Sequence, residues 1–142
     1  MEIFVDDVHE ETSEQPGDFY SLALFREVGD DLEGLELQRA VGGIYGRPED
    51  GIPPYCIVGA DHSTSLGGVH RVVCRGATVD LYFSDDAQQK LGLPEGHVAL
   101  VLNVSAADLE RVKAGLVRIF AGGDFDYPQP DLVGFEKAGQ GC

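Results

Sequence analysis

The amino-acid sequence predicts an α+β fold: a mainly antiparallel sheet of about six strands, with a short helix and one C-terminal amphipathic helix packed on it. Three observations lead to this class. Six short segments have the apolar patterns of strands, most connections between them are of hairpin length, and two later segments carry helix signals. The length of 142 residues suits about one domain.

The chain divides into three expected regions. Residues 1–18 have few apolar positions after Val8 and end in the turn-like segment QPGD, so we expect a flexible acidic leader. Residues 19–123 form a single α+β domain. Residues 124–142 are rich in proline and glycine and are expected to form an irregular tail.

Apolar patterns mark the expected strands. FYSLALFREV and LELQRAV alternate with period two, and the glycine-rich turn at residues 29–34 joins them. In ATVDLYF one face is apolar and the other polar, whereas HVALVLNV is apolar on both faces, as expected of a central strand. The six expected strands cover residues 19–28, 35–41, 55–59, 67–75, 77–83 and 97–104.

A short helix is predicted directly after the fifth strand. Ser84 suits the N-cap position, and Asp85 and Asp86 suit the positive end of the helix dipole. Gly92 suits the left-handed position just past the last turn.

A second, amphipathic helix of about four turns is predicted after the sixth strand. Ser105 and Asp108 resemble a capping box, and the segment ends at the pair Gly122 and Gly123. The apolar positions that repeat at helical spacing are Leu109, Val112, Leu116 and Ile119 or Phe120.

Net charge is the most unusual total. The chain has 25 acidic and 10 basic side chains, a net charge of −15, and residues 1–61 hold 15 of the acids and 3 of the bases. Nucleic acid is excluded as a ligand, because phosphate binding requires clustered Lys and Arg. The acidic excess indicates either a solvated face or a surface that attracts a basic partner. No apolar run is long enough to cross a membrane and no secretory signal is present, so a cytoplasmic protein is expected.

Two cysteines and two histidines fall within residues 55–74: Cys56, His62, His70 and Cys74. Their spacing matches no common zinc pattern, and both cysteines lie in apolar strands where a free thiol packs as a small hydrophobe. A reactive Cys–His pair is also disfavoured, because such a thiolate needs an electropositive, exposed setting. We expect free thiols, no metal, no cofactor and no catalytic residues.

An alternative function remains open at this stage. Asp61, His62 and His70 could line a pocket beside the long loop at residues 42–54, as in a small-molecule-binding protein or an enzyme. That loop, GGIYGRPEDGIPP, is either a contact surface or an ordinary insertion.

Several short motifs, taken in order, resemble one known family. They are LELQR, YCIV, GGV, RGATVDLYFSDDAQQKLGL and LERVKAGLVRIF, spread over residues 19–120. This combination is similar to immunity protein family 10 of bacterial polymorphic toxin systems. The resemblance implies a non-enzymatic antidote that binds and neutralises a cognate toxin domain. The acidic leader, the 42–54 loop and the tail have no counterpart in it.

The resemblance and the acidic charge together suggest a binding surface. Many such toxins are nucleases with basic clefts, and an acidic surface can mimic the nucleic-acid backbone. The partner is therefore expected to be a cognate toxin protein, with a basic nuclease as one such case, and neither nucleic acid nor a membrane. An exposed sheet edge leaves a homodimer open. The expected partner-binding residues are Asp30, Asp31, Glu33, Glu36, Glu49 and Asp50.

Overall fold

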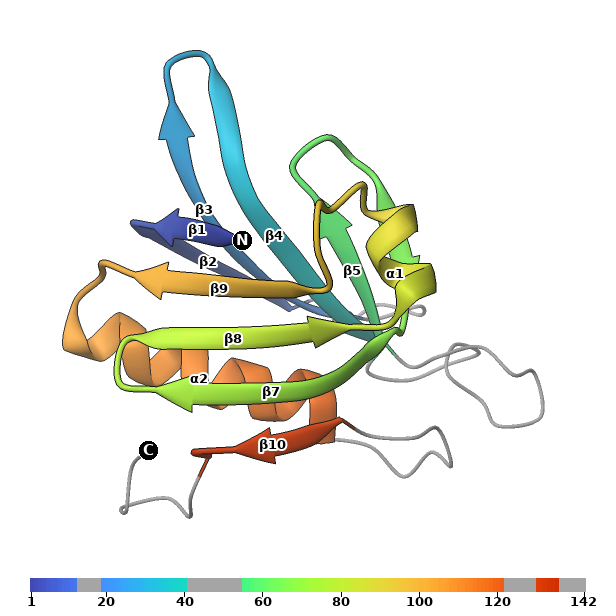
Figure 1. Cartoon of the computed structure of the whole chain (residues 1–142). Helices are drawn as coiled ribbons and strands as arrows, with labels where there is room; N and C mark the ends of the chain where they lie inside the picture. The colour runs from blue at the N-terminus through green and yellow to red at the C-terminus, as the bar shows by residue number, and fades with distance from the viewer. Residues whose placement is uncertain (13–18, 41–54, 122–129, 136–142) are drawn as a thin grey trace.

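The structure is a computed structural model that describes residues 1–12, 19–40, 55–121 and 130–135, and these residues form two sheets and two helices (Figure 1). Sheet A contains, in order, β1 (Glu2–Val5), β9 (His97–Leu102), β8 (Thr78–Phe83), β7 (Val69–Arg75) and β10 (Asp131–Val133). Sheet B contains β2 (Asp7–Thr12), β3 (Phe19–Val28), β4 (Asp31–Ala40), β5 (Tyr55–Gly59) and β6 (Thr64–Leu66). The helices are α1 (Asp85–Lys90) and α2 (Ala106–Ala121).

The α+β class is confirmed, and each of the six predicted strands and two predicted helices has a counterpart. The prediction of one sheet of about six strands is wrong, because the described residues form ten strands divided between two five-stranded sheets. Most pairs are antiparallel, as predicted. The exceptions are β1 with β9 and β10 with β7, which are parallel.

The leader and the tail contribute strands that the sequence did not predict. Ile3, Val5 and Val8 alternate inward and are buried, so the expectation of a mobile leader is wrong for residues 2–12. Their burial stabilises the ordered form of an otherwise acidic segment. In the tail, β10 pairs with β7, and Leu132 packs against the core. Residues 13–18, 122–129 and 136–142 lie outside the described part of the chain.

One continuous hydrophobic core joins the inner faces of both sheets and α2. Helix α2 runs behind β7 and β8 in Figure 1 and contacts β3 and β4 of sheet B. Each large apolar side chain in this core contributes roughly 1.5–3 kcal/mol to stability. Its fully buried members include Leu22, Leu24, Leu37, Ile57, Leu81, Leu100, Leu116 and Ile119.

Both helix starts follow the predicted caps. The hydroxyl oxygens of Ser84 and Ser105 each accept a hydrogen bond from the backbone N–H three residues later, at 3.2 and 3.1 Å. At the other end of α2, Nη1 of the buried Arg39 donates to the carbonyl oxygen of Ile119 at 2.7 Å. Burial lowers the pKa of Arg39. Strand β4 thus supplies a cation at the negative end of the helix dipole.

A close approach between α2 and β3 depends on a glycine inside the helix. A Cβ atom on Gly115 would lie 2.4 Å from the hydroxyl oxygen of Tyr20. That hydroxyl donates to Oε2 of Glu10 at 2.5 Å, and Nε of Arg111 donates to Oε1 of Glu10 at 2.8 Å. The pKa of Glu10, which burial alone would raise, is lowered by these two hydrogen bonds. The cluster fastens β2 and β3 to α2.

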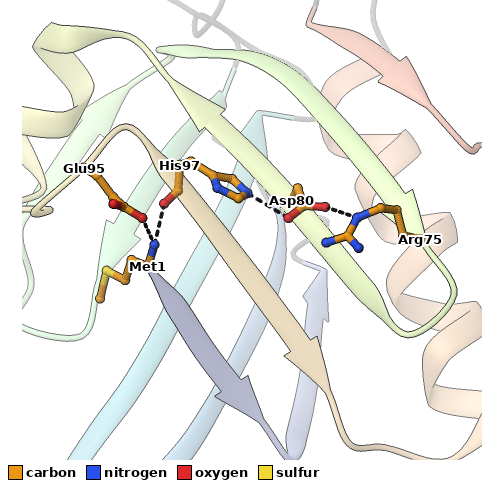
Figure 2. Close-up of polar contacts among 5 residues, drawn as sticks. All are labelled: Met1, Arg75, Asp80, Glu95 and His97. Carbon is orange, nitrogen blue, oxygen red and sulfur yellow. Dashed lines mark hydrogen bonds and ion pairs between the residues drawn. The ribbon is translucent and has the colours of Figure 1, made fainter.

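A polar chain crosses the outer face of sheet A (Figure 2). The carboxylate of Asp80 accepts a hydrogen bond from Nε of Arg75 at 2.6 Å and lies 2.7 Å from Nε2 of His97. The ring of His97 stacks on Tyr82 with 4.6 Å between centroids, and Asp80 is only 2% exposed. The hydrogen bond from Arg75, opposed by burial and assisted by His97, lowers the pKa of Asp80.

The Gly115→Ala variant should be less stable than the wild type by about 1–3 kcal/mol, because the added methyl group overpacks the contact with Tyr20. Helix propensity alone would predict a gain of about 1 kcal/mol. Urea denaturation followed by circular dichroism measures the difference. Adding Tyr20→Phe, which removes the clashing oxygen, should recover part of the loss. A variant more stable than the wild type would contradict the close approach.

The Asp80→Asn variant should lose about 1–3 kcal/mol of stability at pH 7, because the buried carboxylate loses its charge-assisted hydrogen bonds. Since the folded-state pKa of Asp80 is lowered, its contribution is present above the unfolded pKa of about 4 and is lost as pH falls through the folded value. The gap between wild type and variant, measured by urea denaturation, should therefore narrow below about pH 4. A gap that stays constant down to about pH 2 would contradict this role.

Candidate functional site

The hairpin of β3 and β4 extends beyond the rest of sheet B. Strand β2 pairs with β3 only as far as Phe25, and β5 pairs with β4 only from Leu35 onward. Residues 26–33 therefore have a strand partner only within the hairpin, although Arg26 lies over the ring of Phe4 on β1, and the tip projects at the top of Figure 1. Val28 pairs with Asp31, which leaves a two-residue turn.

The tip of this hairpin is acidic, with apolar side chains between the acids. Asp30 and Asp31 are exposed and have no ion-pair partner among the described residues, whereas Glu33 pairs with Nη2 of Arg26 at 2.8 Å. Val28 is 46% exposed and Leu32 is 54% exposed. Both side chains lie next to the acids on the projecting tip. We refer to residues 26–33 as the acidic hairpin.

A groove of about 260 Å³ lies on the outer face of sheet B, next to the acidic hairpin. It exists because strand alternation sends Leu22 and Leu24 into the core and leaves Ala23 and Phe25 on the outer face, where the ring of His9 on β2 stacks on Phe25. The groove spans three strands and the turn after β5. Its lining includes Ala23, Phe25, Leu32, Gly34, Glu36, Val58, Gly59, Ala60 and His62.

Glu36 is the one carboxylate in the lining of this groove, among the residues that the structure describes. It stands in the middle of the sheet, opposite Ala23 on β3 and Val58 on β5. Its Oε2 accepts a hydrogen bond from the hydroxyl of Ser21 at 2.7 Å and another from the side-chain amide of Gln38. These two donors fix the carboxylate in one orientation.

The structure brings four of the six predicted binding residues to one region. Asp30, Asp31 and Glu33 lie on the acidic hairpin, and Glu36 lies in the adjoining groove. Glu49 and Asp50 fall outside the described residues. Sequence reasoning missed the apolar part of the site, which includes Phe25, Leu32 and Val58. The period-two pattern of β3 held the signal, since it already separates Phe25 from the core side chains.

The cysteines and histidines of residues 55–74 lie in separate parts of the fold. Cys56 is on β5 of sheet B, whereas His70 and Cys74 are on β7 of sheet A. Cys56 and Cys74 form no disulfide among the described residues, and burial, followed by the charge of Glu36, raises the pKa of Cys56. In the described ranges no group of three or more metal-binding side chains is close enough to hold an ion. The segment forms β5, β6 and most of β7, so the strands predicted at residues 55–59 and 67–75 are confirmed.

The pocket required by the alternative function is not assembled from the predicted residues. His62, at a positive φ of 69° in the turn after β5, lines the groove of sheet B. Asp61 instead accepts hydrogen bonds from the hydroxyl and the backbone N–H of Ser63, and these lower its pKa. His70 is exposed on the other sheet, near Tyr82.

The polar chain on sheet A is the other conspicuous group of titratable side chains. Its central carboxylate, Asp80, already has two partners in Arg75 and His97. The N-terminal amine of Met1 contacts Glu95 and the carbonyl oxygen of His97, which ties β1 to the start of β9 (Figure 2). These contacts link neighbouring strands, so the group has a structural role.

One known protein family matches the part of the chain that carries this surface. No helix in the described ranges is long and apolar enough to span a membrane. Neither a curated protein nor a solved structure matches the chain. A sequence model of the family described as Immunity protein 10 matches residues 7–110, a range that includes β2, the acidic hairpin and the groove. Because this match spans well over half of its length, the chain belongs to the Immunity protein 10 family.

Proposed function

We propose that the chain is an antitoxin that binds a cognate toxin domain through the acidic hairpin and the groove of sheet B and thereby neutralises it. The observation that carries this proposal is membership of an immunity-protein family over residues 7–110. Asp30, Asp31, Glu33 and Glu36 are proposed as contacts, and Glu49 and Asp50 remain part of the proposal from the sequence. We place the encounter in the cytoplasm, before the toxin leaves the producing cell.

Charge supports this choice of surface. The exposed carboxylates of Asp30 and Asp31 have no cation beside them in the described structure, so their field extends into solvent. Such a field accelerates encounter with a basic partner and weakens with salt. A nuclease toxin, whose active-site cleft is basic in order to hold phosphates, is the class of partner that this field suits.

Apolar side chains support the same surface for a different reason. Charged rims contribute mainly to association rate, whereas affinity comes from well-packed residues near the centre of an interface. Val28 and Leu32 on the hairpin, with Phe25 and Val58 in the groove, supply apolar area next to the acids. The surface thus has both components of a tight protein–protein interface.

The family also indicates a role without catalysis. An immunity protein acts by binding its toxin, so a non-enzyme is the simplest interpretation of the match. The alternative, a small-molecule-binding protein or enzyme, has no specific observation in its favour among the described residues, since His62 and His70 lie in different parts of the fold.

The double variant Asp30→Lys with Asp31→Lys should weaken binding to the toxin domain encoded beside this chain. We expect a dissociation constant at least about 10-fold higher at low salt, mostly through slower association, and a smaller difference at high salt. Surface plasmon resonance at two salt concentrations measures both. Cells that co-express the toxin should be protected by the wild type and less well by the variant.

The matched control is Asp86→Lys with Glu110→Lys, which changes net charge equally at exposed positions of α1 and α2. It should alter affinity less than about threefold. Equal effects of the two double variants would show that overall charge matters and would remove the hairpin from the mechanism. A wild-type chain that neither binds nor protects would reject the proposed function itself.

A further inference from the structure

The groove on sheet B combines apolar walls with a single oriented charge. Ala23 and Val58 flank Glu36 across the strands, and Phe25 lies further along β3 on the same face. Oε2 of Glu36 accepts two hydrogen bonds, from Ser21 and Gln38, while Oε1 has no partner among the described residues. The carboxylate is therefore fixed at one oxygen and free to accept at the other.

We propose that this groove receives the side chain of one lysine or arginine of the bound toxin, an inference that rests on the proposed function and specifies its central contact. The aliphatic stem of that side chain packs on Ala23, Phe25 and Val58, and its charged head donates to Oε1 of Glu36. Lysine and arginine are the two side chains that combine a long apolar stem with a cationic end.

The size of the groove suits a single side chain. Its volume of about 260 Å³ lies below the roughly 300–1,000 Å³ of pockets that hold drug-sized ligands. It is open along the sheet face between the acidic hairpin and the turn at His62. A side chain that projects from a docked surface can enter such a groove from above.

The loss of water from Glu36 on binding makes the groove selective for a cationic side chain. A toxin surface that covers the groove removes water from Glu36, and an ionised carboxylate that is buried without a partner opposes binding strongly. A partner with an apolar or acidic group at this place is therefore rejected, whereas a partner with a cation regains the lost solvation. Ser21 and Gln38 already hold the carboxylate in its orientation. Binding therefore costs little additional conformational entropy at this side chain.

The test compares Glu36→Gln with Glu110→Gln in binding to the toxin domain encoded beside this chain. The amide oxygen that Glu36→Gln introduces can still accept from Ser21 and Gln38, so the fold should persist, which thermal denaturation checks. We expect Glu36→Gln to raise the dissociation constant about 30-fold or more, mainly through faster dissociation. Glu110→Gln, the same change at an exposed position of α2 outside the proposed surface, should raise it less than about threefold.

A double-mutant cycle then identifies the cation. Each interfacial lysine and arginine of the toxin domain is changed to alanine and measured against wild type and Glu36→Gln. One of them should lose most of its effect in the Glu36→Gln background. If Glu36→Gln binds within about threefold of wild type, or if no basic residue couples to it, this inference is overturned while the proposed function stands. If wild type does not bind the toxin domain, the proposed function fails first.

Discussion

The strands of sheet B differ in length, and this difference determines which part of the sheet projects. Strands β3 and β4 each run for ten residues, whereas β5 contributes five and β2 six. The excess length has no strand partner at either edge, so the hairpin projects beyond sheet B, with Arg26 lying over the ring of Phe4 on β1. A two-stranded ribbon is marginal by itself in water, and its order depends on the well-packed lower halves of the same strands. The core of sheet B is thus the support of the acidic hairpin.

Helix α2 covers one face of sheet B and leaves the other face open. The helix packs on the inner face, where Gly115 allows it to approach Tyr20 closely, and Arg39 reaches from β4 to its C-terminal carbonyl groups. No described element covers the outer face. The side chains there are accordingly a mixture of apolar residues and acids. Charge and apolar area meet on one surface because the long helix of the described fold packs elsewhere.

Local patterns in the sequence predicted much of this fold. The six strands and two helices were readable from periodicity, and Ser84 and Ser105 were readable as caps, because these features depend on neighbours within a few residues. The division into two sheets was not readable. It depends on β1 pairing in parallel with β9, which is distant along the chain, and on three inward apolar side chains in a segment whose composition is otherwise acidic.

The candidate site divides in the same way. Asp30 could be placed on the hairpin turn, and Asp31 beside it, from their surroundings alone. The groove could not be predicted, because it forms only when the register sets Ala23, Glu36 and Val58 side by side from three strands. Sequence reasoning therefore grouped Glu36 with the exposed acids, although its hydrogen bonds and apolar neighbours give it a different environment.

The passage from β1 to β2 also has a consequence for how the molecule is assembled. A single residue, Asp6, separates β1, an edge strand of sheet A, from β2, an edge strand of sheet B. One short segment therefore supplies an edge strand to each sheet. Its partner in sheet A, β9, ends at Leu102 and is synthesised long after it. The ribosome must therefore deliver most of the polypeptide before this edge can close, and contacts so distant along the chain are characteristic of slow folding.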